Sequence, residues 1–500
     1  MKNTFLLYVR MLGLMLVTLL TTRIVLKELG ENDYGIYNVV GGVVIVFSIF
    51  SSSLTAAISR FLTYELGKGS DERLNDYFSN SVILQIILGL IICVIIEFGG
   101  TWFLNNKMNI AYDMLESANI VLQCSILIFF INLISTPYNA VIIAHERMST
   151  YAALSILDVL LKLLAAYLIS YVNSQRLVYY SIFLVIEAFA IRMIYSLYCR
   201  RVFEECNLKW RINGAVFREL LAFSGWNFIG ASSGILKDQG VNLLLNIFGN
   251  TIINAARGLS MQVGSAATSF TSSFVTALNP QITKEYAIGN KTSSIILTVR
   301  GAKFSVFLVW FIALPILLET DTLLAIWLTE IPNYTPIFVR LSIVYVVIET
   351  FSMTLITLML ATGNIKKYQI IVGGMQLLNF PFSWIALYLG IGYVAPYYIA
   401  ICISLVCLNI RLYLLWKMVK LSIRTYYRET VLPAVLVIII SSVIPFCLEL
   451  YMYNSTFKFF IVISMALIST SLSIYYVGLN QNERIHIKKI LKRKLGRYAY

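Results

Sequence analysis

Charged and chemically reactive side chains are scarce in this sequence. Only 13% of the 500 residues are Asp, Glu, Lys or Arg, and there are two histidines, nine prolines and seven cysteines. The hydrophobic share is 59% and the mean hydropathy is +0.78. No soluble domain of this length carries such a composition without a large exposed apolar surface. The solvent for most of the chain is therefore lipid.

The histidines and cysteines show no pattern typical of catalysis or metal binding. His145 lies in a predicted turn and His486 in a basic C-terminal stretch, and the cysteines are scattered through apolar segments. They lack both the spacing of metal ligands and that of a disulfide framework. A multi-spanning glycosyltransferase would use acidic residues after its first helix, where Glu31 and Asp33 lie, but no soluble domain accompanies them. We expect neither an enzyme nor a bound metal or cofactor.

Long apolar runs dominate the chain. A membrane-spanning helix needs about 20 predominantly apolar residues, and we count fourteen such stretches. The first contains Arg10 and is followed by no small-residue cleavage site, so we expect it to be retained as a helix. The sequence thus predicts an all-α polytopic membrane protein. The predicted spans are 5–26, 36–62, 82–103, 120–143, 152–172, 178–197, 220–248, 252–278, 304–318, 337–360, 370–389, 394–416, 432–452 and 459–477.

The net charge of +14 could suit a nucleic-acid partner, but the positions of the basic residues favour a membrane. With a cytoplasmic N-terminus, most of the 39 Lys and Arg residues fall on the cytoplasmic side, which is the positive-inside bias. An even number of spans then leaves both termini in the cytoplasm. We expect no nucleic acid, and we expect the basic tail, 481–500, either to lie on anionic lipid or to be a disordered solubilising tail.

The chain divides into related parts. We predict an N-terminal lobe of six helices (1–199), a cytoplasmic linker (200–218), a C-terminal lobe of six helices (219–420) and an extra helix pair (421–480). A faint parallel repeat supports the two lobes. Its first copy contains Leu29-Gly30 and Tyr64-Glu65-Leu66-Gly67, and its second contains Phe248-Gly249 and Tyr286-Ala287-Ile288-Gly289. Such a repeat, unless it is a chance likeness, places a central cavity between two lobes.

Two predicted spans are unusually polar. Segments 220–248 and 252–278 are rich in Ser, Gly, Asn and Gln and also carry Lys237, Asp238 and Arg257. Small residues alone would fit close helix packing. Charged groups at bilayer depth are costly unless they meet water or protein. We therefore predict a hydrated cavity lined by these two spans and their counterparts, 5–26 and 36–62.

The first 70 residues contain a series of short motifs: Asn3-Thr4, Tyr8, Arg23, Leu29-Gly30, 33–38 (DYGIYN), Gly41-Gly42, Arg60-Phe61-Leu62 and Glu65-Leu66-Gly67. With these motifs the chain resembles bacterial polysaccharide repeat-unit flippases of the Wzx type, in the superfamily of lipid II flippases and multidrug and toxin extruders. The resemblance implies translocation of an undecaprenyl-diphosphate-linked oligosaccharide across the bacterial inner membrane, by two lobes that alternately open a cationic cavity. It also implies a lipid-tail groove at the extra helix pair and, as partners, other O-antigen, capsule or lipopolysaccharide assembly proteins.

A sugar diphosphate needs positive charge along its path, and arginine binds phosphate oxygens through its planar fork. Arg10 and Arg60 lie toward the cytoplasmic side, where snorkelling to the interface is the alternative. An outer-end anchor is the alternative for Arg23. The resemblance favours Arg23 and Arg257, since related flippases carry essential arginines on helices one, two and eight. The predicted substrate-binding cations are Arg10, Arg23, Arg60, Lys237 and Arg257.

Coupling to a proton or sodium gradient would need an acidic group within the membrane. Asp158 and Lys162 share a helix face and are typical of a static ion pair, so Asp238 and Glu349 are the favoured coupling residues and Asp158 the third. A structural contact is the alternative for each. The rival function is a cation-coupled multidrug exporter on the same scaffold, but its cavity would be acidic and aromatic rather than cationic.

Overall fold

The computed structural model of the chain describes residues 2–48, 71–145, 147–362, 366–452 and 456–485, with six single positions between 49 and 70. Every regular element in these residues is helical, so the predicted all-α class is confirmed. The α-helices are α1 (Lys2–Val46), α3 (Asp71–Ile95), α4 (Thr101–Lys107), α5 (Leu115–Ala144), α6 (Met148–Leu168), α7 (Arg176–Val202), α8 (Gly214–Ile235), α9 (Val241–Phe248), α10 (Thr251–Ala287), α11 (Lys291–Leu318), α12 (Thr320–Trp327), α13 (Thr335–Thr350), α14 (Met353–Ala361), α15 (Lys366–Tyr368), α16 (Gly374–Leu377), α17 (Asn379–Tyr388), α18 (Ala395–Val419), α19 (Ile423–Tyr426), α20 (Leu432–Tyr451) and α21 (Thr456–Ser473). Short 3₁₀ segments are η2 (Tyr112–Met114), η3 (Ile169–Tyr171) and η4 (Glu204–Cys206), and π segments are η1 (Ile96–Gly100), η5 (Leu236–Gly240), η6 (Gln369–Gly373), η7 (Tyr427–Val431) and η8 (Ile474–Gly478).

Ten helices in the described part of the chain are long and apolar enough to cross a membrane. They coincide with ten of the fourteen predicted spans. The other four, 5–26, 36–62, 220–248 and 252–278, fall in or next to α1, α8, α9 and α10 and are not among the ten. The predicted count of fourteen is therefore not confirmed, although a multi-pass membrane protein is.

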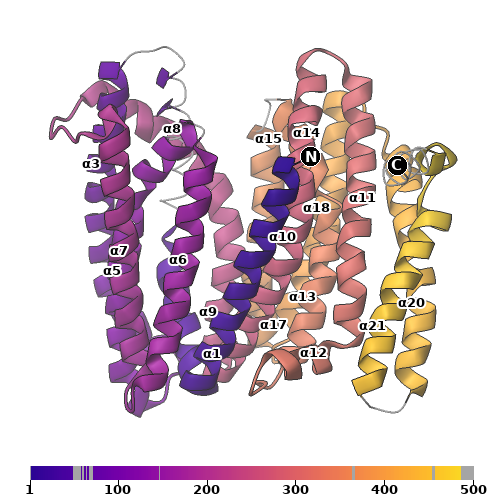
Figure 1. Cartoon of the computed structure of the whole chain (residues 1–500), viewed down its shortest axis with the longest axis horizontal. Helices are drawn as coiled ribbons and strands as arrows, with labels where there is room; N and C mark the ends of the chain where they lie inside the picture. The colour runs from indigo at the N-terminus through magenta and orange to yellow at the C-terminus, as the bar shows by residue number, and fades with distance from the viewer. Residues whose placement is uncertain are drawn as a thin grey trace, which may run out of the picture.

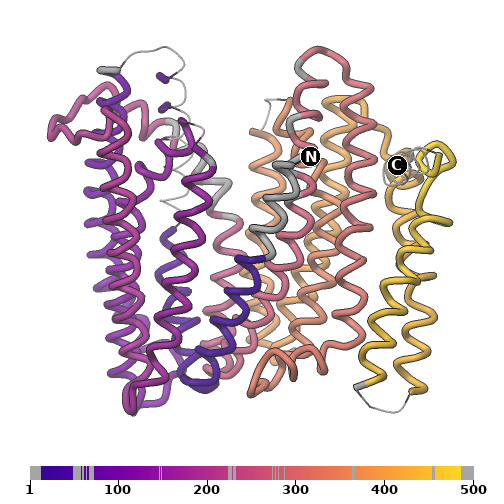
Figure 2. The backbone as a smooth tube through the Cα atoms, in the orientation of Figure 1, coloured from indigo at the N-terminus to yellow at the C-terminus, as the bar shows by residue number. Residues whose placement is uncertain are grey.

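The helices form two bundles and a separate pair (Figure 1). The first lobe contains α3, α5, α6 and α7, and the second contains α10, α11, α13, α14, α17 and α18. Helix α1 crosses obliquely between the two lobes, and α20 and α21 stand together beside α11. The tube in Figure 2 shows that the last described residues lie at the end of the molecule opposite the bend of α1. The predicted residue boundaries of the lobes stay predictions.

The cores of the parts are apolar and continuous. In the second lobe, Val306 of α11, Leu355 of α14 and Leu412 of α18 are fully buried in one cluster. Ala466 of α21 lies in the same cluster, so the extra pair packs on the second lobe through α11. Burial of a Val or Leu side chain contributes about 1.5–3 kcal/mol, and this packing fixes the pair to that lobe.

A sharp bend divides α1 at Gly30, whose φ of 77° lies in the left-handed region that favours glycine. The bend confirms the predicted helix end at Leu29-Gly30, as the end of α9 confirms the one at Phe248-Gly249. Beyond the bend, α1 crosses α10 closely. Thr251 Oγ1 donates to Asn32 Oδ1 at 3.0 Å, and a Cβ atom on Gly35 would lie 1.9 Å from the Thr251 carbonyl oxygen. The two lobes are thus joined tightly at this end.

At the opposite end, the segment between the lobes is attached to α3. Asn75 donates through its side-chain amide to the backbone oxygens of Glu205 and Asn207, at 2.8 Å each. The backbone N–H of Lys209 donates to Ser79 Oγ at 3.0 Å. The predicted linker, 200–218, therefore lies along the first lobe before α8 enters the membrane region.

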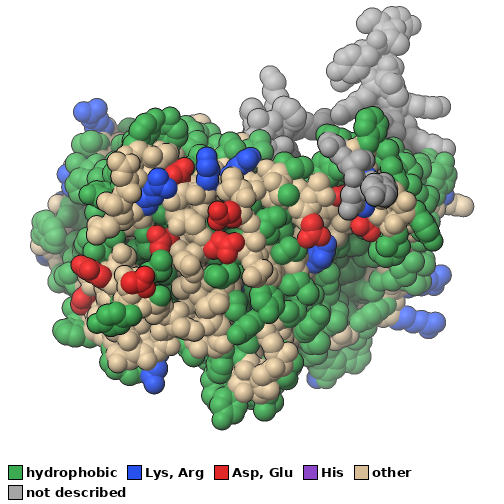
Figure 3. Space-filling view, turned by 90° about the horizontal axis from the view of Figure 1, so that it is seen from below, with side chains coloured by type: hydrophobic (Ala, Val, Ile, Leu, Met, Phe, Trp, Pro, Cys, Tyr) green, Lys and Arg blue, Asp and Glu red, His purple; other side chains and the backbone are tan. Residues whose placement is uncertain are grey.

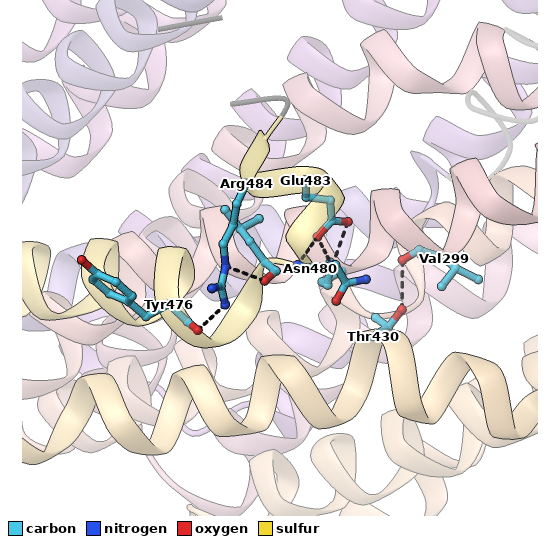
Figure 4. A network of polar contacts seen from close by, with 8 residues as sticks. Val299, Thr430, Tyr476, Asn480, Glu483 and Arg484 are labelled. Carbon is cyan, nitrogen blue, oxygen red and sulfur yellow. Dashed lines mark hydrogen bonds and ion pairs between the residues drawn. The ribbon is translucent and has the colours of Figure 1, made fainter. Parts of the chain in front are cut away.

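The end of the described chain is tied to α11 by a buried ion pair (Figure 4). Lys303, which is 2% exposed, donates to both carboxylate oxygens of Glu483, at 2.7 and 2.9 Å. Glu483 also accepts from the backbone N–H of Asn480 at 2.8 Å, and Arg484 donates to the carbonyl oxygens of Tyr476 and Leu479. These contacts fix residues 480–484. Most of the predicted basic tail, 481–500, lies outside the described residues.

Candidate functional site: a charged cluster and a neighbouring cavity

The helical run from α8 to α9 is interrupted by the π segment η5, which carries Lys237 and Asp238. Segments of this kind are frequent at functional sites. Lys237 is 16% exposed, donates to the Tyr345 hydroxyl of α13 and lies 4.8 Å from the centre of that ring. Its Nζ is 3.9 Å from Asp238 Oδ1, at the limit of an ion pair, and Asp238 is half exposed. The ammonium group thus keeps a polar, partly accessible environment.

Arg257 lies on α10, near Asp238 and Tyr345. It is 9% exposed, and its guanidinium carbon is 4.6 Å from the ring centre of Tyr397 of α18. Its Nε has no hydrogen-bond partner among the described residues, and it forms no ion pair with any described carboxylate. A cation over an aromatic ring is partly stabilised, and Asp238 lies near enough to attract Arg257 without forming an ion pair with it. Arg257 is therefore the cation of this site best able to bind an anion.

A second charged pair, Glu349 and Arg411, lies near Tyr345. Glu349 accepts from Arg411 Nη2 at 3.3 Å and from the Ser404 hydroxyl. Arg411 is only 2% exposed, and its Nε and Nη1 have no hydrogen-bond partner among the described residues. The sequence did not single out Arg411, because it lies near the end of span 394–416, where basic side chains usually reach the interface. We name the second-lobe cluster by its members, Lys237, Asp238, Arg257, Tyr345, Glu349, Tyr397 and Arg411.

The first lobe contains a cavity of about 540 Å³ between α1, α5, α6 and α7. Lys162 and Glu187 lie on its wall. The predicted pair of Asp158 and Lys162 is present, with Nζ 2.9 Å from the carboxylate oxygen. Glu187, which lies in the predicted span 178–197, is 7% exposed. The remaining lining includes Thr18, Thr21, Thr22, Tyr34, Tyr37, Asn38, Ser125, Asn132 and Tyr180.

Helix α1 connects the first-lobe cavity with the second lobe. Thr22 lines the cavity, and its hydroxyl accepts from Gln262 Nε2 of α10 at 2.6 Å. Asn38 lines it as well, and its carbonyl oxygen accepts from Asn242 Nδ2 of α9 at 3.4 Å. Hydrogen bonds from α1 to α9 and α10 therefore connect the wall of the first-lobe cavity with the other lobe.

The structure brings together Lys237, Asp238, Arg257 and Glu349 of the predicted site residues, and it places Asp158 apart, in the first lobe. Arg23 is exposed on α1 and forms no ion pair with a described residue. Arg10 lies in α1, but its side chain is outside the described part of the structure, as is the whole of Arg60. The predicted path along Arg10 and Arg60 stays a prediction.

The end of the molecule where α1 bends is seen in Figure 3, with acidic side chains distributed over it. Basic residues predicted on the outer side are paired with them. Arg340 lies 2.6 Å from Asp321 and Arg176 lies 3.1 Å from Glu28. Burial raises the pKa of the Asp33 carboxyl in the same region. Arg176 and Arg340 are thus each paired with a carboxylate, unlike Arg257.

Comparison with known proteins identifies the family. The model of the family described as "Polysaccharide biosynthesis protein" matches residues 1–285, more than half of the chain. The chain is 20% identical over 148 residues to the uncharacterized membrane protein EpsK of Bacillus subtilis (strain 168), a match that spans 30% of this chain and 29% of that protein.

Two solved structures show the same fold. An inward-facing multidrug resistance transporter of the MATE family, in the MOP superfamily, superposes with a TM-score of 0.69 at 12% identity, over 81% of this chain and 94% of that one. The lipid II flippase MurJ, in an inward closed conformation, superposes with a TM-score of 0.68 at 12% identity, over 98% and 99%. The predicted fold is confirmed: the chain has the fold of a MOP-type transporter, and it belongs to the family of polysaccharide biosynthesis proteins.

Proposed function

We propose that this protein carries an undecaprenyl-diphosphate-linked oligosaccharide from the cytoplasmic to the outer leaflet of a bacterial inner membrane. The observation that carries the proposal is Arg257, a buried cation in the second lobe that forms no ion pair with a described carboxylate. Family membership supports a role in polysaccharide biosynthesis. The transporter fold supports movement of a substrate rather than its synthesis.

The chemistry of the second-lobe cluster suits a diphosphate. Its three basic groups, Lys237, Arg257 and Arg411, exceed its two carboxylates, Asp238 and Glu349, by one positive charge. Arginine and lysine donate charge-assisted hydrogen bonds to phosphate oxygens, and such bonds strengthen when water is excluded. The anionic headgroup would bind at Arg257 and Lys237, with Arg411 held in place by Glu349.

An alternating-access cycle would carry the bound substrate from the cytoplasmic side to the outer side. The lobes are joined closely where α1 meets α10, at Gly35 and Thr251. With the termini in the cytoplasm, as we propose, this joined end faces outward, so the substrate loads from the cytoplasmic side. Release would require the α1–α10 contact to open and the linker end to close. Asp238 remains a candidate for ion coupling, and other polysaccharide assembly proteins remain the expected partners.

The test replaces Arg257 by Ala in a strain whose surface glycan depends on this protein. We expect display of the glycan to fall roughly ten- to a hundredfold and lipid-linked oligosaccharide to accumulate, because the variant loses a charge-assisted bond of about 1.5–3 kcal/mol together with the excess positive charge of the second-lobe cluster. Display is measured by lectin or antibody binding, and accumulation by mass spectrometry of extracted lipids.

Arg340→Ala is the matched control, because Arg340 is paired with Asp321 at the outer end. It should display glycan normally at equal membrane abundance. Normal display in the Arg257→Ala strain, or an equal loss in both strains, would contradict the cationic-site proposal.

A second candidate function is a multidrug exporter on the same scaffold. It is supported by the superposition on a MATE family transporter and by the half-exposed carboxylate of Asp238, which could meet a cationic drug. Increased drug susceptibility of a deletion strain that displays its glycan normally would favour this function over glycan transport.

A further inference from the structure

A basic and aromatic surface lies at the C-terminal end of α18, where the chain passes from the second lobe to the extra helix pair. Tyr413, Trp416, Lys417 and Lys420 follow one another at helical spacing, so they share one face of α18. All four side chains are exposed. This face is therefore available to a ligand from outside the helix bundle.

The two lysines of this face are held beside aromatic rings. Lys417 Nζ is 4.6 Å from the ring centre of Tyr413, and Lys420 Nζ is 5.9 Å from that of Trp416. An aromatic ring attracts a cation but brings no negative charge to it. Neither lysine forms an ion pair with a carboxylate in the described ranges of the chain. Both ammonium groups thus keep their charge for an anion.

The segment after α18 adds two arginines to the same surface. Tyr427 of η7 donates through its hydroxyl to Asn409 Oδ1 on the exposed face of α18, at 2.8 Å. Arg424 lies one helical turn before Tyr427, and Arg428 lies one turn after Arg424, and both are exposed. Glu429 is the only acidic residue between positions 409 and 431. The four exposed basic groups therefore leave an excess of three positive charges.

Exposed apolar side chains continue both helices away from this charged end. They include Leu405 and Val406 on α18, and Leu432 and Ile439 on α20. Tryptophan and tyrosine are typical of the membrane interface, so the basic groups lie at the level of lipid headgroups and the apolar ones at the level of acyl chains. A ligand that fits both parts is an amphiphile with an anionic head.

The surface lies at the end of the molecule opposite the bend of α1. Tyr393, shortly before α18, donates through its hydroxyl to the Phe248 carbonyl oxygen at the end of α9, at 3.2 Å. Helix α18 therefore begins at the end where α1 bends and finishes at the opposite end. With the termini in the cytoplasm, as we propose above, the surface faces the cytoplasmic leaflet, whose anionic lipids attract basic side chains.

We propose that the α18–η7 surface binds the headgroup of an anionic phospholipid of the cytoplasmic leaflet. Its members are Tyr413, Trp416, Lys417, Lys420, Arg424 and Arg428. The lipid phosphate accepts charge-assisted hydrogen bonds from the lysines and arginines, and the acyl chains lie along the exposed apolar face of α18. The bound lipid thus bridges the second lobe and the start of the extra helix pair. The site does not depend on the proposed transport function, and only its leaflet follows from the proposed orientation.

The site is tested on the purified full-length protein, freed of lipid in a neutral detergent, by native mass spectrometry. The protein is titrated with phosphatidylglycerol or with phosphatidylcholine of the same chains, and we expect phosphatidylglycerol to bind at lower concentration. Lys417→Gln with Lys420→Gln should weaken phosphatidylglycerol binding about tenfold or more and leave phosphatidylcholine binding unchanged, because only the anionic headgroup uses the lysines. Arg424→Gln with Arg428→Gln should give a loss of similar size. Thermal unfolding without added lipid should stay the same, since all four side chains are exposed.

Lys284→Gln with Lys291→Gln is the matched control, because it removes two exposed lysines at the same end of the molecule but outside this surface. It should bind phosphatidylglycerol as the unchanged protein does. An equal loss in the control and the Lys417→Gln, Lys420→Gln variant, or full binding in the latter, would overturn the proposal. Displacement of phosphatidylglycerol by inorganic phosphate at the same concentration would also overturn it, because the surface would then select a free anion rather than a lipid.

Discussion

The second-lobe cluster and the first-lobe cavity use the same chemical groups with opposite balance. The cluster sets three basic groups against two carboxylates, with tyrosines under Lys237 and Arg257. The cavity sets Lys162 against Asp158 and Glu187, with tyrosines alongside. An excess cation suits an anionic substrate. Two regions of opposite charge balance thus lie on either side of α1.

The largest expected difference concerns stability. Arg411→Ala leaves Glu349 without its cation, and removal of one partner of a buried pair costs about 3–5 kcal/mol. Lys162→Ala removes a side chain that is 44% exposed, so its effect should stay below about 1 kcal/mol. Thermal unfolding of both variants in the same detergent measures the difference.

The double variant Arg411→Met with Glu349→Gln is the control for this comparison, since it removes both charges. It should regain most of the lost stability. Equal destabilisation by Arg411→Ala and Lys162→Ala would show that the two regions are buried to a similar extent, contrary to the structure.

A smaller effect separates the geometry of Arg257 from its charge. Arg257→Lys keeps the charge but loses the planar fork that binds two phosphate oxygens. We expect glycan display to fall roughly tenfold, corresponding to about 1.4 kcal/mol, in the assay used for Arg257→Ala. Full display in the lysine variant would mean that charge alone suffices at this position.

The smallest effect concerns the bond that joins the two regions. Gln262 donates to Thr22 across α1 and α10, and a hydrogen bond of this kind contributes about 0.5–1.5 kcal/mol. A double-mutant cycle with Gln262→Leu and Thr22→Val, read by thermal unfolding, should give a coupling energy of about 1 kcal/mol. Purely additive effects would contradict a connection through this bond.

Local sequence patterns predicted the fold better than the site. Apolar runs located ten spans, and Gly30 and Gly249 marked two helix ends, because both signals are local. The polar content of 220–248 and 252–278 pointed to Lys237, Asp238 and Arg257. The sequence missed the role of Arg411 because its partner, Glu349, is 62 positions away on another helix. It could not show that α6 and α7 bring Lys162 and Glu187 to the wall of one cavity.

The buried pair of Lys303 and Glu483 has a practical consequence for measurement. Since Glu483 is held on α11 (Figure 4), the chain leaves the second lobe from a fixed point. A fluorophore placed at Ile485 would follow the tilt of that lobe with little independent rotation. A second dye on the α3-bound linker, at Lys209, would complete a distance pair that reports the rocking of the transporter in real time.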